Sequence, residues 1–147
     1  MLQRLVSLLS GETEAPAEDV EDAHRIAIAA LLVEAARADG VYDADERAMI
    51  GQILAERFGL SEDAASTLRA EGEEAQAEAV DLVRFTRAIK DAVPIEERIE
   101  VIEAVWRVVY ADGERDAHEG NLIRRLAGLL YVPDREAGLA RQRVTGS

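Results

Sequence analysis

An internal repeat constrains this chain more than any other feature of its sequence. Residues 38–46 read ADGVYDADE, and residues 111–119 read ADGERDAHE. Each segment lies between two stretches whose apolar residues recur at helical spacing. The repeat therefore predicts two related helix–loop–helix halves, joined by two acidic linking helices and related by a pseudo-twofold axis.

The remainder of the chain also predicts helices. Ala, Leu, Glu and Arg, which are strong helix formers, dominate, and no run of β-branched residues bounded by turns indicates a strand. We expect Ser61 to N-cap one helix and Pro94 to be the first residue of another. Apolar periodicity predicts helices over about 17–38, 44–58, 62–75, 79–92, 95–111 and 117–131. The expected fold is all-α, a compact helical bundle of about seven helices.

A length of 147 residues fits one domain. We expect residues 1–16 to form a short N-terminal helix, Met1–Leu9, followed by a linker. Residues 17–133 are expected to form the helical domain. Residues 134–147 are expected to form a C-terminal tail with room for a short helix.

The charge and the residue types exclude several classes of function. Lys and Arg number 17 against 30 for Asp and Glu, so the net charge is −13. This balance disfavours nucleic acids and anionic membranes as partners, because both require a basic face. The chain has no cysteine, which rules out disulfides, thiolate metal sites and cysteine nucleophiles.

The expected location is the cytoplasm. No apolar stretch is long enough for a transmembrane segment, and the apolar run near the N-terminus is too short for a secretory signal. The acidic run 71–78 is expected to be a solvated helix face, with a docking surface for a basic partner as the alternative. The identity of a protein partner and the oligomeric state stay open at this point.

Helix capping explains most of the repeated loop. In the first copy, Gly40 suits the left-handed residue that ends a helix, Asp43 suits an N-cap, and Glu46 completes a capping box. The second copy repeats these types as Gly113, Asp116 and Glu119. Capping does not explain Asp39 and Asp112, because an acidic residue in the last turn of a helix opposes the helix dipole.

The same spacing also predicts a cation site. The stretch from Asp39 to Glu46 matches the second half of an EF-hand loop, whose oxygens bind Ca²⁺. A complete EF-hand is rejected, because Ala35 and Arg37 stand where the first ligands would be. Two half-sites brought together, or one weak site per loop, stay open for Ca²⁺ or Mg²⁺, beside capping alone. The candidate metal ligands are Asp39, Asp43, Glu46, Asp112, Asp116 and Glu119.

With these two loops, each after a long Ala-rich helix, the chain resembles the TerB-like family. That family includes tellurite-resistance protein B and the similar cytoplasmic domain of the membrane-anchored DjlA co-chaperone. The resemblance covers about residues 22–132. It implies an all-helical domain, a role in tellurite resistance or the general stress response, and action through partners such as other stress-response proteins. It also implies that the acidic loop residues bind metal.

Two classes of function follow from these observations. The favoured one is a non-enzymatic binding or scaffold module. The alternative is a metal-dependent enzyme that uses the same acidic cluster, or a co-chaperone-type domain resembling the DjlA cytoplasmic domain. Glu21 and His24 have the spacing of a di-iron ligand pair, but the second pair is missing, so a solvated helix face is the favoured interpretation.

Overall fold

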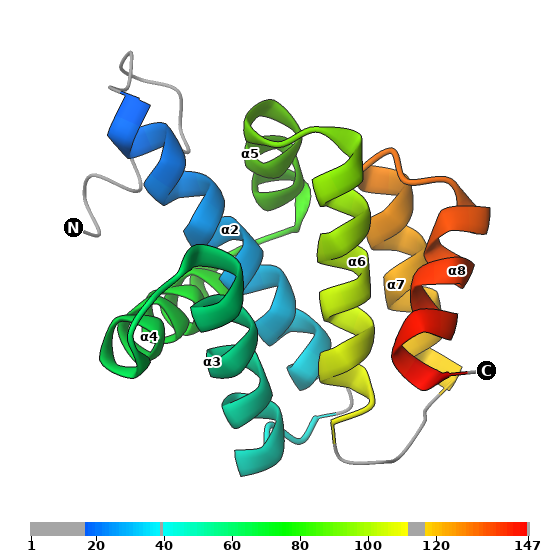
Figure 1. Ribbon diagram of the computed structural model, residues 1–147, viewed down its shortest axis with the longest axis horizontal. Coiled ribbons are helices and arrows are strands. Elements are labelled where there is room, and N and C mark those ends of the chain that lie inside the picture. Colours follow the sequence, from blue (N-terminus) through cyan, green and yellow to red (C-terminus); the bar gives the residue numbers. More distant parts are fainter. Residues whose placement is uncertain (1–16, 39, 112–116, 147) are drawn as a thin grey trace.

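Helices account for the regular structure of the part of the chain that the structure describes (Figure 1). The computed structural model describes residues 17–38, 40–111 and 117–146, of which 17–21 and 117–120 are described by their backbone alone. None of the helices in these ranges combines the length and the apolar character needed to cross a bilayer. They are α2 (Ala17–Arg37), α3 (Ala44–Phe58), α4 (Glu62–Glu78), α5 (Val83–Ala92), α6 (Ile95–Val109), α7 (Ala117–Leu129) and α8 (Asp134–Thr145).

This arrangement confirms the predicted all-α fold. α3 has the predicted bounds, and Ser61 caps α4 by accepting the Ala64 N–H at 3.1 Å. α2, α6 and α7 end slightly before the expected residue, whereas α4 continues to Glu78. Pro94, predicted as the first residue of α6, is its N-cap instead. The predicted helix Met1–Leu9 lies outside the described residues.

The start of α5 differs from the prediction. The helix begins at Val83 and not at residue 79, because the backbone at Ala79 is extended and the Asp81 carboxylate accepts the Val83 N–H at 2.9 Å. The periodicity of residues 79–92 predicts that Val80 and Val83 face the core together with Leu82, Phe85 and Ile89, but Val80 is 100% exposed and Val83 is 42% exposed. The other residues predicted for this face are buried: Leu82, Phe85 and Ile89.

α2 is the central helix of the fold. Every residue from Ile28 to Val33 is fully buried, and α3, α4, α5, α6 and α7 all pack against α2. Apolar residues at helical spacing predict one buried face on this helix: Ile28, Leu31, Leu32, Ala35 and Ala36. All five are buried, and Ala29 and Ala30 on the remaining faces are buried as well. A helix that is apolar all round is expected in the middle of a core.

α4 approaches α2 more closely than ordinary side chains allow. A Cβ atom added to Gly72 would lie 2.5 Å from the Ala29 Cβ, 2.9 Å from the Ala29 carbonyl carbon and 3.0 Å from the Ala30 nitrogen. The backbone of α4 therefore rests directly on α2, and a glycine is required at the crossing.

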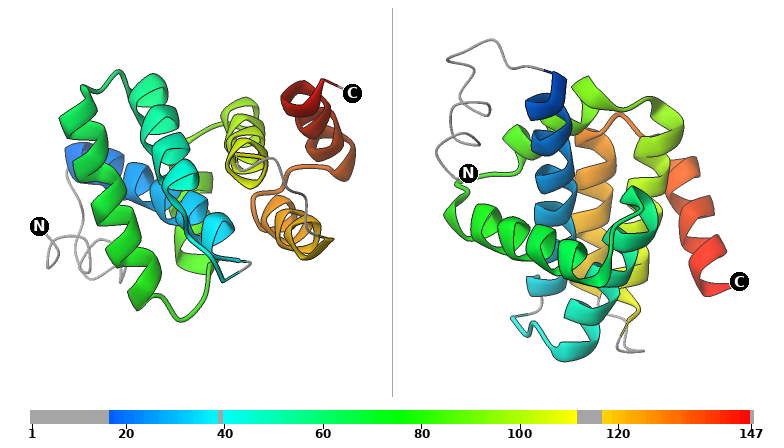
Figure 2. Two further views of the ribbon diagram at one scale, coloured as in Figure 1. Left: turned by 90° about the horizontal axis from the view of Figure 1, so that it is seen from below. Right: turned by 60° about the vertical axis from the view of Figure 1, so that its left-hand side comes forward.

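The two repeat units, α2–α3 and α6–α7, lie side by side. α2 and α6 pack together and both end in the lower half of Figure 1, as the second view of Figure 2 also shows. The first helix of each unit contacts the second helix of the other, α2 with α7 and α6 with α3. This reciprocal packing is the arrangement that a pseudo-twofold repeat predicts.

α8 is longer than the short helix expected in the C-terminal tail, and it packs on α6. The Trp106 Nε1–H donates to the Ala137 carbonyl at 3.2 Å. The Arg143 Nε donates to the Glu103 carboxylate at 2.8 Å. These contacts join the C-terminal segment to the same core as the repeat units.

Replacing Gly72 by Ala is expected to lower the free energy of unfolding by about 1–3 kcal/mol, because the added carbon must push α4 away from α2. Helix propensity alone predicts the opposite, a gain of up to about 1 kcal/mol. Gly138→Ala is the matched control, since Gly138 lies within α8 and a Cβ there would meet nothing within 4 Å. Urea unfolding measures both variants, and a stabilised Gly72→Ala protein would contradict the close crossing.

Candidate functional site

The first acidic loop connects α2 with α3. α2 ends at Arg37, and Gly40 takes the left-handed backbone conformation with φ of 87°. The Gly40 N–H donates to the Arg37 carbonyl at 3.0 Å. This glycine therefore has the helix-ending role that the sequence predicts for it.

Asp43 and Glu46 form the predicted capping box at the start of α3. The Asp43 Oδ1 accepts the Glu46 N–H at 2.8 Å, and the Glu46 Oε1 accepts the Asp43 N–H at 3.0 Å. Glu46 is 2% exposed, whereas Asp43 is half-buried. The helix dipole favours carboxylates in this first turn, so both residues stabilise the start of α3.

The structure brings together two of the six predicted metal ligands, Asp43 and Glu46. The other four lie outside the residues whose side chains are described: Asp39, Asp112, Asp116 and Glu119. Among the described side chains, no group of three or more His, Cys, Asp or Glu residues could hold a metal ion. The helices that precede the two repeated segments, α2 and α6, end on the same side of the molecule (Figure 1).

Tyr42 ties this loop to α4, a contact that the sequence does not reveal. The Tyr42 hydroxyl donates to the Glu73 Oε2 at 2.5 Å. Two arginines also approach this oxygen, with the Arg47 Nε at 3.8 Å and the Arg69 Nε at 3.6 Å. The Glu73 side chain is 20% exposed, so the expectation that residues 71–78 form a solvated face is wrong at this position.

The end of α2 joins the same cluster. The guanidinium carbon of Arg37 lies 5.0 Å from the centroid of the Tyr42 ring, and that of Arg47 lies 5.8 Å from it. Arg37 also donates to the side chain of Gln76 on α4. Cations near an aromatic face are attracted to it, so the ring is held between α2 and α3.

The buried surroundings of Tyr42 change its ionisation. Burial of the ring, followed by the hydrogen bond to Glu73 and the charge of that carboxylate, raises the pKa of the Tyr42 phenol well above its ordinary value. Arg69 and Arg47 oppose this effect, but they do not reverse it. The phenol therefore stays protonated and keeps donating to Glu73.

His24 is also placed differently from the expectation. It is 5% exposed and packs edge to face against Phe58, with ring centroids 5.9 Å apart, so it is not on a solvated face. The signal was in the sequence, because His24 lies four residues before Ile28 and seven before Leu31, on the same helix face.

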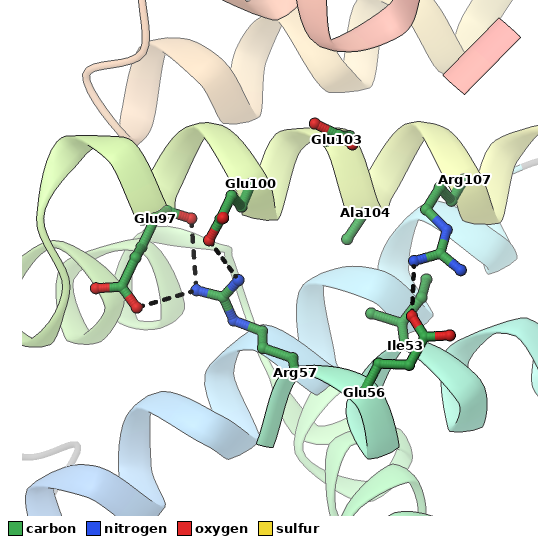
Figure 3. Close-up of a pocket in the computed structure, with 8 residues that line it drawn as sticks. All are labelled: Ile53, Glu56, Arg57, Glu97, Glu100, Glu103, Ala104 and Arg107. Carbon is green, nitrogen blue, oxygen red and sulfur yellow. Dashed lines mark hydrogen bonds and ion pairs between the residues drawn. The ribbon is translucent and has the colours of Figure 1, made fainter. Parts of the chain in front are cut away.

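A charged groove lies between α3 and α6 (Figure 3). Its volume is about 410 Å³, and the buried residues Ile53 and Ala104 lie within it. Arg57 of α3 pairs with Glu100 at 3.3 Å and with Glu97 at 3.8 Å. In the reverse direction, Glu56 of α3 pairs with Arg107 of α6 at 3.3 Å.

The ion pairs of this groove explain its charged lining. Gln52 and Arg107 both donate to Glu56 and lower the pKa of its carboxyl. The fourth acidic residue, Glu103, pairs with Arg143 of α8. Exposed pairs of this kind contribute about 0–1 kcal/mol each, so they account for the charged lining and add little to the stability of the fold.

The chain matches a known protein family. The family model for the tellurite resistance protein TerB matches residues 25–142. The matched range extends from α2 into α8 and includes both repeated loops. No curated protein and no solved structure matches the chain.

Asp43→Ala is expected to lower the free energy of unfolding by about 0.5–2 kcal/mol, because the Glu46 N–H loses its acceptor. Asp43→Asn should cost less, since asparagine also caps helices well. Ser61→Ala, at the cap of α4, gives the cost of an ordinary cap in the same protein. Urea unfolding measures all three, and an Asn variant as unstable as the Ala variant would show that the charge of Asp43 matters more than its cap.

Tyr42→Phe is expected to change how stability depends on pH. The pKa of Tyr42 is raised in the folded protein, so the contribution of its phenol is complete below about pH 10 and is lost as the pH rises further. The variant should lose about 1 kcal/mol near neutral pH, because the hydrogen bond to Glu73 is gone. Its stability should then decline less steeply above about pH 10 than that of the wild type.

Chemical unfolding across this pH range measures both effects. Tyr131→Phe is the matched control, since it removes a phenol at a position that is 71% exposed. Parallel alkaline declines for the wild type and Tyr42→Phe would contradict the raised pKa.

Proposed function

The chain belongs to the TerB family of tellurite resistance proteins, and on that premise we propose that it is a non-enzymatic binding module whose acidic loops hold a divalent cation. Its proposed place of action is the cytoplasm, and its proposed partners are other proteins of the stress response. The observation that carries the proposal is the pairing of Asp43 with Glu46 beside the left-handed Gly40.

The donor atoms of this pair suit a hard cation. Carboxylate and carbonyl oxygens are the preferred ligands of Ca²⁺ and Mg²⁺, and the loop offers Asp43, Glu46 and the backbone between them. One oxygen of each carboxylate is used in the capping box. Cation binding through the Glu46 Oε1 would therefore compete with the Asp43 N–H, which favours a modest affinity.

The packing of the repeats supports two loops acting together. α2 and α6 lie against each other and end on the same side, so the loops that follow them start close to one another. Asp39, Asp112, Asp116 and Glu119 complete the proposed ligand set on the ground of sequence alone.

A binding role is favoured over catalysis because the carboxylates of Asp43 and Glu46 are both used in the capping box. Asp43 and Glu46 each accept a backbone N–H of the other, which holds them as structural acceptors. A general acid or base needs a carboxyl group positioned to exchange a proton with a substrate.

Cation binding can be tested by thermal unfolding with and without Ca²⁺, Mg²⁺ or Zn²⁺. An ion at about 100 times its dissociation constant should add about 2.7 kcal/mol to the stability of the folded protein. The Asp39→Ala/Asp112→Ala double variant should lose this gain, because one proposed ligand is removed from each loop.

The capping variant Ser61→Ala is the control, since it weakens α4 without touching either loop. It should start from a lower midpoint and keep the full response to the ion. A wild-type midpoint that no ion raises would reduce the repeated motif to helix capping and overturn the cation site.

A further inference from the structure

A second surface, formed by α5 and α7, has features that neither the core nor the acidic loops explain. A hollow of about 370 Å³ lies between α7 and the connection from α4 to α5. Val80, Val83 and Leu129 contribute apolar atoms to it, and Arg125 stands at its wall. Val80 is 100% exposed and Val83 42%, so two apolar side chains face solvent beside this hollow.

Tyr131, just beyond the end of α7, is a further exposed residue with a large apolar part. It is 71% exposed, and its φ of 57° places it in the left-handed region. It stands at the turn that ends α7, where the Val132 N–H donates to the Ala127 carbonyl at 2.8 Å. Glycine is the residue that such a turn favours, and a bulky aromatic residue there is strained.

Because Tyr131 is both strained and exposed, its presence indicates a role other than stabilising the fold. Tyrosine in this conformation gains little from burial here, because most of its surface is exposed. Backbone strain that the fold does not need is commonly found at functional sites. Exposed tyrosines are also enriched where proteins bind one another.

The cations around this surface differ from those that line the groove between α3 and α6. Arg57 and Arg107 in the groove between α3 and α6 both form ion pairs. By contrast, five cations on α5 and α7 form no ion pair with any residue that the structure describes: Arg84, Arg87, Lys90, Arg124 and Arg125.

Three of these cations are aligned with the apolar surface. Arg87 and Lys90 follow Val83 by one and two helical turns, so the three side chains share one face of α5. The Lys90 Nζ lies 4.1 Å from the centroid of the Tyr131 ring. Arg125 of α7 lines the same hollow as Val83. The result is an apolar strip with a hollow, flanked by cations, on a chain whose net charge is −13.

We propose that this face of α5 and α7 docks an acidic segment of a partner protein, with one large apolar side chain of that segment in the hollow and its carboxylates on Arg87, Lys90 and Arg125. The hollow suits a single side chain, whereas a bilayer is flat and offers none. Glu34 and Asp81 also line it, so the hollow takes the apolar side chain of the segment, and its carboxylates lie on the cations beside it. A continuous anionic surface, such as lipid headgroups or nucleic acid, would meet Glu34 and Asp81 and is therefore disfavoured. The proposal does not depend on cation binding by the loops.

The test uses the full chain and nuclear magnetic resonance. The probes are short Glu-rich peptides that each carry one Leu, Phe or Trp, at millimolar concentration, with Gln-rich peptides as neutral controls. Acidic probes should shift the backbone amide signals of residues 80–90 and 125–131, and the affinity should fall as salt is added. If no acidic probe shifts these signals, or if the neutral peptides bind equally well, the proposal is overturned.

Charge variants separate local pairing from net charge. Arg87→Glu/Arg125→Glu should weaken binding by about tenfold or more. Arg107→Glu/Arg143→Glu changes the net charge equally on α6 and α8, and it should leave the affinity within about twofold. An equal loss in both double variants would overturn the assignment to α5 and α7.

Tyr131→Gly tests the aromatic residue itself. Because glycine relieves the left-handed strain, the thermal midpoint should stay the same or rise, while peptide affinity should fall by about tenfold. A lower midpoint with unchanged affinity would mean that Tyr131 serves the fold. Val80→Ser removes an exposed apolar group and should weaken binding without unfolding the protein.

Two other occupants are distinguished by the same variants. Sedimentation equilibrium would reveal a dimer, and Arg87→Glu/Arg125→Glu would dissociate a dimer formed through this face. Binding to vesicles of phosphatidylglycerol that the same double variant weakens would reveal a membrane as the occupant. Either result, without peptide binding, would overturn the proposed partner.

Discussion

The packing of α2 is the constraint on which the rest of the structure depends. This helix has no free face along its middle turns, so each neighbouring helix must fit a surface of mostly small side chains. Where α4 crosses it, Gly72 meets Ala29 and Ala30, and the two backbones come almost into contact. Aromatic residues make up only 4% of the chain, and aliphatic residues of modest size fill a core with narrow spacing between helices.

The position of the acidic loop after α2 depends on the crossing of α4 over α2. α4 rests on α2 and carries Glu73, whose carboxylate accepts a hydrogen bond from the Tyr42 hydroxyl. The loop is therefore attached to two helices whose relative placement is already set. The capping box then directs the chain into α3. The same carboxylates that start α3 are proposed cation ligands, and structure and binding would therefore share one set of atoms.

Local features of the fold were accessible from the sequence, whereas features made by distant residues were not. Helix periodicity, the caps at Ser61 and Asp43 and the turn at Gly40 depend on neighbours within a few residues. The burial of Val80 was predicted wrongly, because an apolar residue type does not reveal that the Asp81 carboxylate accepts the Val83 N–H and that the helix begins only there. The contact from Tyr42 to Glu73 joins residues that no spacing rule relates.

The candidate site was predicted in the same uneven way. The repeated motif identified Asp43 and Glu46 as a pair, because capping follows from spacing alone. The surface on α5 and α7 escaped prediction, because it combines residues from two helices and a turn, and its charges appear ordinary in a chain with 17 Lys and Arg residues. The strain at Tyr131 is visible in the backbone and has no trace in the sequence.

Lys90 has a further consequence, because it is the sole lysine in the chain. The other cations are arginines, which do not react with reagents directed at primary amines. A fluorophore or a photo-crosslinker that acylates primary amines would therefore modify one side chain, that of Lys90 beside the Tyr131 ring, and otherwise only an α-amino group. The molecule carries its own attachment point for a reporter at the junction of α5 and α7, with no engineered residue needed to create it.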